Sequence, residues 1–301
     1  MTENVVWLND VSMSDVEKVG GKNASLGEMI SGLSSRGIQV PGGFATTAEA
    51  FESFLNHSNL RHQINELLLS LDITNIEDLT KTGAAIRQWV EEAPFPKELY
   101  ESIVNSYQAL TDQLGPHVTF AVRSSATAED LPEASFAGQQ ETFLNVSGID
   151  DILLAIKKVF ASLYNDRAIS YRVHQGFKHE IVSLSAGVQQ MVRSDIGSSG
   201  VMFTLDTESG FNDVVFITSA YGLGETVVQG SVNPDEFYVH KQTLNSGRPA
   251  ILSRKLGSKS IKMIYADTES NISVKTVSVQ KKQRLQFSLD DVQIEQLAKY
   301  A

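Results

Sequence analysis

Apolar residues recur at helical spacing through the first 175 residues of the chain. After the glycines at positions 20 and 21, this spacing predicts a helix that ends near Gly37. The apolar positions of its face are Leu26, Met29, Ile30 and Leu33. Further helices are predicted from Thr46 or Thr47 to about 55, near 60–70, 76–91, 96–114 and 150–163, and at 166–175. A strand is predicted at 118–122, and a polar loop follows it at 123–140.

From residue 185 the pattern changes to short apolar runs separated by turn residues. These runs predict strands at 185–193, 199–205, 213–219 and 235–240. We therefore predict an α+β fold of two subdomains, a helix-rich one at 1–184 and a strand-rich one at 185–301. Ser288 and Asp291 are predicted to cap a last helix that runs to Ala301 without a stop signal. We expect from this that the second subdomain is truncated at its C-terminal end.

Composition narrows the class of protein. The chain has 301 residues, of which 42% are hydrophobic and 20% charged, as expected for a globular protein with a sizeable core. It has no cysteine, which excludes thiolate metal sites and fits a cytoplasmic location. No apolar run approaches the roughly 18 residues of a membrane span, so no membrane partner is expected. The net charge of −11 disfavours nucleic acid as a partner, because it repels a phosphate backbone.

The segment Gly20-Gly21-Lys22 at the predicted helix start is the first candidate for chemistry. Backbone N–H groups at a helix N-terminus, the positive end of the helix dipole and a lysine can together hold phosphate oxygens. The segment is not a Walker loop, because Val16 stands where that loop needs glycine and Asn23 where it needs serine or threonine. Taken alone, such a segment is more often a turn with a solvated lysine.

The polar loop at 123–140 is the second candidate. Arg123 opens it at the predicted strand end, and small residues follow. An arginine offers a fork of donors suited to phosphate oxygens, and small residues let the backbone approach a ligand closely. The alternative is an exposed loop in which Arg123 pairs with Glu129 or Asp130.

Two further segments carry weaker signals. At 188–192, an apolar strand edge with Met191 could read an adenine ring, although an ordinary core strand is the more common interpretation. The turn that ends in Glu225 could face a metal–phosphate complex or be a tight turn only. The six histidines form no His-Glu-x-x-His pattern, and no Gly-x-Ser-x-Gly elbow occurs, so a serine hydrolase is disfavoured.

Together these segments resemble the N-terminal ATP-binding domain of the phosphoenolpyruvate synthase family, also called pyruvate, water dikinases. The resemblance is carried by residues 19–29, 40–47, 120–132, 135–143, 199–206 and 222–235. It spans nearly the whole chain and implies an ATP-grasp-like, α+β nucleotide-binding domain, with ATP between two subdomains. Related dikinases, antibiotic phosphotransferases and a non-catalytic nucleotide-binding module remain alternatives.

The resemblance also implies a reaction for the full enzyme. In that family, ATP, pyruvate and water give phosphoenolpyruvate, AMP and phosphate. The β-phosphoryl group moves first to a histidine on a separate domain and then to pyruvate on a barrel domain. Neither domain is part of these 301 residues. The resemblance therefore predicts weak ATP binding at most and no turnover of pyruvate by this chain alone, and it leaves a homodimer of the full enzyme open.

The resemblance assigns residues by motif match. The predicted catalytic residues are Lys22 and Arg123, which would hold the phosphates. The residues predicted to contact the nucleotide are Gly20, Gly21, Lys22, Arg123, Ser124, Thr127, Gly138, Gln190, Met191, Val192 and Glu225. Mg²⁺ is expected with ATP, and its family ligands would lie beyond Ala301, so the metal ligands of this chain stay unknown.

Overall fold

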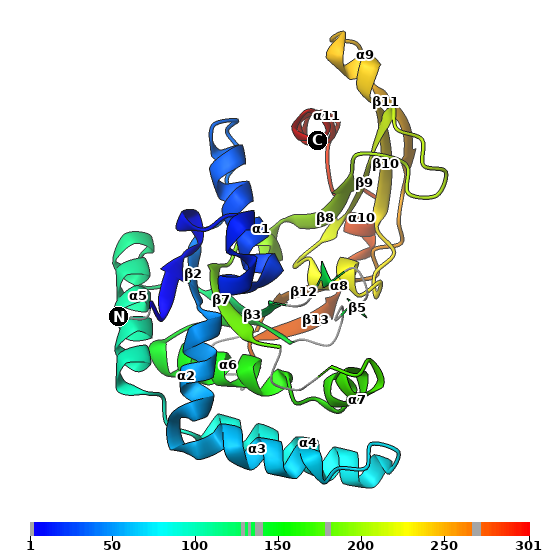
Figure 1. The fold of residues 1–301 in the computed structure, drawn as a ribbon. Coiled ribbons are helices and arrows are strands. Elements are labelled where there is room, and N and C mark those ends of the chain that lie inside the picture. The colour runs from blue at the N-terminus through cyan, green and yellow to red at the C-terminus, as the bar shows by residue number, and fades with distance from the viewer. Residues whose placement is uncertain (1–2, 128–129, 132–133, 136–140, 178–181, 267–271) are drawn as a thin grey trace. The chain divides into compact units, whose positions relative to one another are not determined.

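The computed structural model describes residues 3–127, 130–131, 134–135, 141–177, 182–266 and 272–301 (Figure 1). The chain divides into two units, Met1–Met191 and Val192–Ala301. Each unit packs helices against an antiparallel sheet, so the predicted α+β class is confirmed.

The sheet of the first unit has β7 at its centre. Its described strands follow the order β1-β2-β7-β3-β6, and all neighbours are antiparallel. Their bounds are Val5–Trp7 (β1), Gly43–Thr46 (β2), Phe120–Ala126 (β3), Thr142–Val146 (β6) and Leu184–Gln190 (β7). A small ladder joins Asp130–Leu131 (β4) and Ala134–Ser135 (β5).

The placement of β7 corrects the predicted subdomain boundary. We expected a second subdomain to begin at residue 185, but β7 pairs with β2 and β3, and the division falls after Met191. A short apolar strand has the same local pattern in either unit. Its partners are decided by long-range register, which the local pattern does not contain.

Helices cover both faces of this sheet. They are α1 (Val16–Ser34), α2 (Ala48–Asn56), α3 (Leu60–Leu69), α4 (Ile76–Glu92), α5 (Lys97–Leu114), α6 (Ile149–Ser162) and α7 (Asp166–His174), with the 3-10 turns η1 (Leu8–Asp10), η2 (Met13–Asp15) and η3 (His57–Asn59). Phe120, Val122 and Ala126 of β3 point into the main core, which α2, α4, α5 and α6 complete. On the opposite face, α1 closes a smaller core with Val6, Leu8 and Ala45.

Several local predictions are confirmed and others are wrong. Thr47 caps α2 by accepting the N–H of Ala50 at 3.1 Å. β3 continues to Ala126, so Arg123 and Ser124 lie in a strand and not in a loop. The strands β1, β2 and β6 were missed, because runs of three to five residues carry little periodic signal.

The sheet of the second unit has the described order β11-β10-β9-β8. Its strands are Ser198–Phe203 (β8), Val214–Tyr221 (β9), Asp235–His240 (β10) and Ile251–Lys255 (β11), and a separate hairpin joins Ile261–Tyr265 (β12) to Val274–Ser278 (β13). The helices are Ser194–Ile196 (η4), Glu225–Val228 (α8), Lys241–Asn245 (α9), Lys281–Arg284 (α10) and Asp291–Tyr300 (α11). α11 packs Ile294 and Ala298 onto the apolar face of this sheet.

The cap of α11 differs from the prediction. Asp290 accepts the N–H of Gln293 at 2.8 Å, and the Gln293 side chain accepts the N–H of Asp290 at 3.0 Å. The predicted pair of Ser288 and Asp291 is therefore wrong. Ser288 is instead hydrogen-bonded to Asp235, a residue 53 positions away that no local pattern reveals.

Candidate functional site

Gly20-Gly21-Lys22 lies at a break in α1. Gly20 has φ 75° and ψ 162°, so the helix stops there and restarts at Gly21. The first turn of a helix offers N–H groups that have no intrahelical acceptor, at the positive end of the dipole. A Cβ on Gly20 would lie 2.5 Å from the carbonyl oxygen of Ser125, so only glycine allows this close approach to β3.

The restarted helix is held on the sheet by Asn23, which is fully buried. The backbone N–H of Asn23 donates to Ser125 Oγ of β3 at 3.2 Å. Its side-chain amide donates to Ser185 Oγ of β7 at 2.9 Å and to the carbonyl oxygen of Val19 at 3.1 Å. The helix start is thereby fixed to β3 and to the central strand β7.

Arg123 lies on the same face of the sheet as this helix start. In β3 it pairs with Gly187 of β7 and Thr142 of β6. Side chains alternate along a strand, so half-buried Arg123 shares the α1 face with Ser125. The Ser124 side chain points to the opposite face and is buried. The structure therefore brings Arg123 and the Lys22 helix start to one face and directs the Ser124 hydroxyl away from it.

Thr127 extends the pairing of β3 with β7 by one residue. Its N–H donates to the carbonyl oxygen of Ser183 at 3.1 Å, and its Oγ1 accepts the N–H of Ser183 at 3.4 Å. Thr127 is therefore bound within the sheet. Gly138 and residues 128–129, 132–133 and 136–140 of the predicted phosphate-covering loop lie outside the described residues.

The segment at Gln190, Met191 and Val192 connects the two units. The prediction that it exposes a strand edge is wrong for β7, which lies between β2 and β3. The N–H of Gln190 donates to the carbonyl oxygen of Gly42 at 3.0 Å, and the N–H of Met191 donates to that of Thr119 at 2.9 Å. Two backbone donors of the predicted adenine segment are therefore used within the first unit.

Arg193 follows the connection and forms a bidentate pair with Asp195. Its guanidinium donates to both carboxylate oxygens of Asp195, at 2.8 and 2.9 Å, and lies 4.8 Å from the centre of the Tyr265 ring. The hydrogen bond from Arg193 lowers the pKa of Asp195 below its usual value. This pair orders the entry of the chain into the second unit.

Glu225 begins α8 in the second unit. Its carboxylate accepts the side-chain amide of Gln229 at 2.7 Å. The preceding turn is docked on β12: the N–H of Leu223 donates to the carbonyl oxygen of Met263 at 2.9 Å. Gly222 has φ 88°, and a Cβ there would lie 2.5 Å from the same Met263 oxygen. The turn is therefore tightly packed, and the Glu225 side chain is half-buried at its end.

The second unit also contains a buried ion pair, which was not predicted from the sequence. Asp235 and Lys259 are both fully buried and pair with each other. Asp235 also accepts the N–H of Gly257 at 2.9 Å, and the N–H and hydroxyl of Ser288 at 2.7 and 2.8 Å. The carboxylate is thus fully engaged inside the protein, and no local signal separates Lys259 from the surface lysines.

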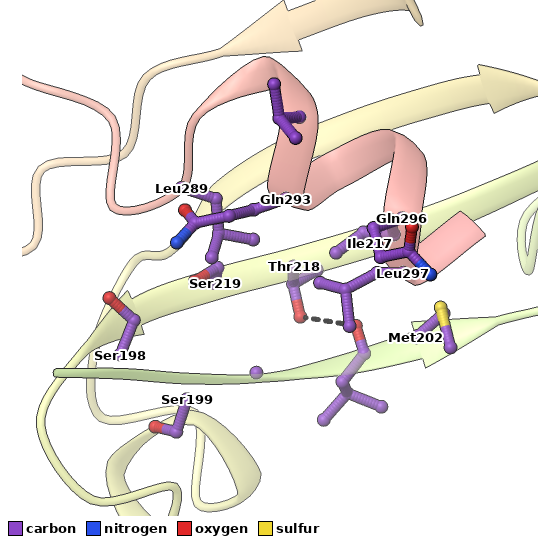
Figure 2. A pocket seen from close by; sticks show the side chains of 13 residues that line it. Ser198, Ser199, Met202, Ile217, Thr218, Ser219, Leu289, Gln293, Gln296 and Leu297 are labelled. Carbon is purple, nitrogen blue, oxygen red and sulfur yellow. Dashed lines mark hydrogen bonds between the residues drawn. The ribbon is translucent and has the colours of Figure 1, made fainter. Parts of the chain in front are cut away.

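A cavity of about 540 Å³ lies in the second unit between β8, β9 and α11. Figure 2 shows Ser199 and Ser219 from the strands and Gln293 and Gln296 from α11 around it. Its lining residues are aliphatic residues, methionine, serine, threonine, glycine and glutamine, and none carries a charge. A cavity without cations cannot neutralise phosphates, so it does not compete with the Lys22 and Arg123 face as an anion site.

No three or more His, Asp or Glu side chains in the described part of the chain lie together in a way that could hold a metal ion. Likewise, none of the described helices is both long and apolar enough to cross a membrane.

Known proteins match the chain over almost its entire length. The family model described as pyruvate phosphate dikinase, AMP/ATP-binding domain, matches residues 16–301. A phosphoenolpyruvate synthase of Pseudomonas aeruginosa is 62% identical over 100% of this chain and 38% of its own length. Those of Neisseria meningitidis and Escherichia coli are 59% and 60% identical, over 100% and 99% of this chain and 38% of their own lengths. The chain thus spans 38% of the length of these curated relatives.

Proposed function

The chain belongs to the family of the pyruvate phosphate dikinase AMP/ATP-binding domain, and on this premise we propose that its first unit binds the phosphates of ATP. Lys22 and the N–H groups of the restarted α1 helix hold phosphate oxygens from one side, and Arg123 of β3 holds them from the adjoining strand. One observation carries the proposal: the break at Gly20 puts a helix N-terminus on the sheet face that also bears Arg123.

The physical chemistry of this face suits a polyphosphate. Helix N-termini bind anions through first-turn N–H groups and the helix dipole. Charge-assisted hydrogen bonds contribute about 1.5–3 kcal/mol each. Arg123 adds a planar fork that can contact two phosphate oxygens at once, whereas Lys22 adds a compact charge. Gly21, the first residue of the restarted helix, has no side chain that would block the approach of a ligand.

The remaining predicted contacts belong to the same proposal. Val192 and Glu225 contact the nucleotide, and the two units are the subdomains of an ATP-grasp-like fold with their boundary after Met191. Mg²⁺ arrives as part of the MgATP substrate, since Mg²⁺ binds phosphate oxygens and keeps several waters. The described residues form no carboxylate cluster that would hold the ion alone, so we assign it no protein ligand.

For the longer protein we propose the activity that the relatives' names state. This chain is then the nucleotide-binding part of a cytoplasmic phosphoenolpyruvate synthase. Phosphoryl transfer from ATP to a histidine, and from there to pyruvate, takes place with domains in the part of the relatives that this chain does not span. Identities of 59–62% to synthases support this choice over other phosphotransferases.

Calorimetric titration of the 301-residue chain with MgATP tests the proposal. We expect saturable binding that weakens about tenfold or more in Lys22→Ala and in Arg123→Ala, the loss that one charge-assisted hydrogen bond implies. Arg123→Lys should restore only part of the affinity, because a lysine cannot contact two oxygens as a fork does.

Lys18→Ala is the matched control for Lys22→Ala. Lys18 lies on the other side of the Gly20 break and pairs with Glu3 at 2.7 Å, so its removal should leave MgATP binding unchanged. Absence of saturable binding by the wild-type chain, or wild-type affinity in Lys22→Ala, would overturn the proposal.

A further inference from the structure

Asn23 directly follows Lys22 in the helix but faces the sheet. Lys22 is half-buried, whereas Asn23 has no exposed surface. In a Walker loop, the residue after the lysine is a serine or threonine that reaches the metal. Here Asn23 occupies that place, but it points into the protein and contacts strands β3 and β7. Its role must therefore be different.

Asn23 occupies the third position of the restarted helix, where a capping oxygen is normally required. Gly20 stands at the N-cap and has no side chain to supply it. Ser125 of β3, 102 residues further along the chain, supplies the oxygen instead, accepting the N–H of Asn23 at 3.2 Å. The helix start is thus capped by the same strand that carries Arg123.

The Asn23 side chain also spans the break. Its amide donates to the carbonyl oxygen of Val19, which precedes Gly20, and to Ser185 Oγ of β7. The hydroxyl of Ser185 donates in turn to the carbonyl oxygen of Thr46 in β2, at 2.5 Å. One side chain therefore joins both halves of α1 to two neighbouring strands.

The fit of Asn23 is close. A Cβ on Gly187 of β7 would overlap Asn23 Oδ1, so glycine at 187 makes room for the asparagine. Oδ1 is buried and has no hydrogen-bond partner among the described residues. Burying an acceptor in this way costs stability. The three hydrogen bonds that Asn23 makes offset this cost, and because they run to Val19, Ser125 and Ser185 they also fix the direction of the helix start.

We propose that Asn23 is a positioning residue for the phosphate site: it sets the angle at which α1 restarts, and so the direction of Lys22 and of the first-turn N–H groups. The inference rests on the proposed function of this face. It assigns a role to Asn23, Ser125 and Ser185 in binding the β- and γ-phosphates, although none of these side chains contacts the nucleotide.

The affinity ratio of ATP to AMP measures this role. Both ligands share the adenosine and the α-phosphate, so the ratio reports on the terminal phosphates. We expect Asn23→Ala to lower the ratio about tenfold, as Lys22→Ala does, while circular dichroism shows a folded chain. Ser125→Ala and Ser185→Ala each remove one hydrogen bond of Asn23 and should lower the ratio about threefold.

A double-mutant cycle distinguishes the positioning of Lys22 and the first-turn N–H groups from a general loss of stability. If Asn23 acts through Lys22 and the first-turn N–H groups, the variant with both Lys22→Ala and Asn23→Ala should lose less ATP affinity than the sum of the two single losses. Ser162→Ala is the structural control. It removes a buried serine hydroxyl of α6 that donates to the carbonyl oxygen of Val159 at 2.7 Å. This variant should lower the melting temperature and leave the ratio unchanged.

The outcomes distinguish the two proposals. Loss of the ratio in Lys22→Ala with a wild-type ratio in folded Asn23→Ala would overturn the inference and leave the proposed function standing. Additive losses in the double variant would overturn it as well. If Asn23→Ala does not fold, a wild-type ratio in Ser125→Ala overturns it. A wild-type chain that binds no ATP removes both proposals together.

Discussion

Each unit fixes a glycine-containing segment with a buried polar cluster, and the two clusters differ in charge. The first-unit cluster consists of Asn23, Ser125, Ser185 and Thr46, all neutral. The second-unit cluster consists of Asp235, Lys259, Gly257 and Ser288, and its centre is an ion pair. Both clusters join residues that are far apart in the chain, yet only the second contains its own charges and counter-charges.

The two clusters therefore act differently on a ligand: the neutral one leaves the charge of Lys22 available, and the charged one neutralises its own charges inside the protein. A neutral cluster adds no counter-charge beneath Lys22, so the lysine and the positive end of the helix act on an anion in the same direction. In the second unit the charges of Asp235 and Lys259 cancel inside the protein. Asp235 of β10 therefore holds Gly257 and Ser288, which precedes α11, in place. The ion pair leaves no net charge that could attract a ligand.

Removal of one ion-pair partner should have the largest effect. Lys259→Met leaves a buried, uncompensated Asp235, and such losses cost about 3–5 kcal/mol. Urea unfolding followed by hydrogen exchange of residues 192–301 measures the free energy of unfolding of this unit. Lys255→Met is the control, because the pair of Lys255 with Glu236 at 3.1 Å is exposed and should matter far less. Equal losses of unfolding free energy in the two variants would show that the buried pair of Asp235 and Lys259 stabilises the unit no more than an exposed pair does.

The corresponding change in the first unit is Gly20→Ala. A positive φ and an overlap with the Ser125 backbone together should cost about 2–3 kcal/mol and displace the helix start. Gly37→Ala is matched to it, since Gly37 has φ 78° but open space around its Cβ position. We expect about 1 kcal/mol for Gly37→Ala, from the backbone alone. Thermal unfolding and MgATP titration of both variants check this; equal losses would show that close packing on β3 is unimportant.

Part of the arrangement around Lys22 can be predicted from the sequence. The break before Lys22 was predictable, because two consecutive glycines interrupt a helical pattern and the next apolar residues restart it. That Lys22 and Arg123 lie at one site is implied only by the resemblance to a known family, because no spacing rule joins positions 101 residues apart. The α+β class followed from local periodicity, which helices and strands express along the chain itself.

The two clusters were beyond prediction for a physical reason. Asn23 meets Ser125 and Ser185 across 102 and 162 residues, and Asp235 meets Lys259 across 24. Such contacts depend on strand register, because a one-residue shift would turn the strand residues Ser125, Ser185 and Asp235 to the other face of their sheets. From the sequence, Asn23 is recognisable only as a departure from the Walker pattern, and nothing distinguishes Lys259 from the other lysines.

A smaller effect should separate hydrogen bonds to charged and neutral partners. Ser288→Ala removes a hydroxyl that donates to the Asp235 carboxylate at 2.8 Å, and such bonds contribute about 1.5 kcal/mol or more. Ser125→Ala removes the neutral acceptor of the Asn23 N–H, for which about 1 kcal/mol is typical. Urea unfolding of both variants should therefore show the larger loss for Ser288→Ala, although Ser125 is fully buried and Ser288 only half-buried. The reverse order would mean that charge does not distinguish the clusters.

The smallest effect concerns acid pH and the Arg193–Asp195 pair. The hydrogen bond from Arg193 lowers the pKa of Asp195 below 3.8, so the unfolded chain binds this proton more tightly than the folded one. The pair's contribution to stability is complete well above pH 3.8 and is lost as the pH falls through the lowered pKa of the folded state. Wild type should thus exceed Asp195→Asn in unfolding free energy at pH 7, and the gap should narrow as the pH falls below 3.8.

Glu208→Gln is the control for this pH dependence, because it changes an exposed carboxylate of the same unit and should produce no comparable gap. Unfolding curves of the three proteins at pH 7, 5 and 3 give the comparison. Asn23→Ala provides the contrast from the first unit: its contacts involve no titrating group, so its loss of stability should be the same at all three pH values. A wild-type advantage over Asp195→Asn that persists unchanged at pH 3 would mean that the pair stabilises the unit by packing on Tyr265 and not by charge.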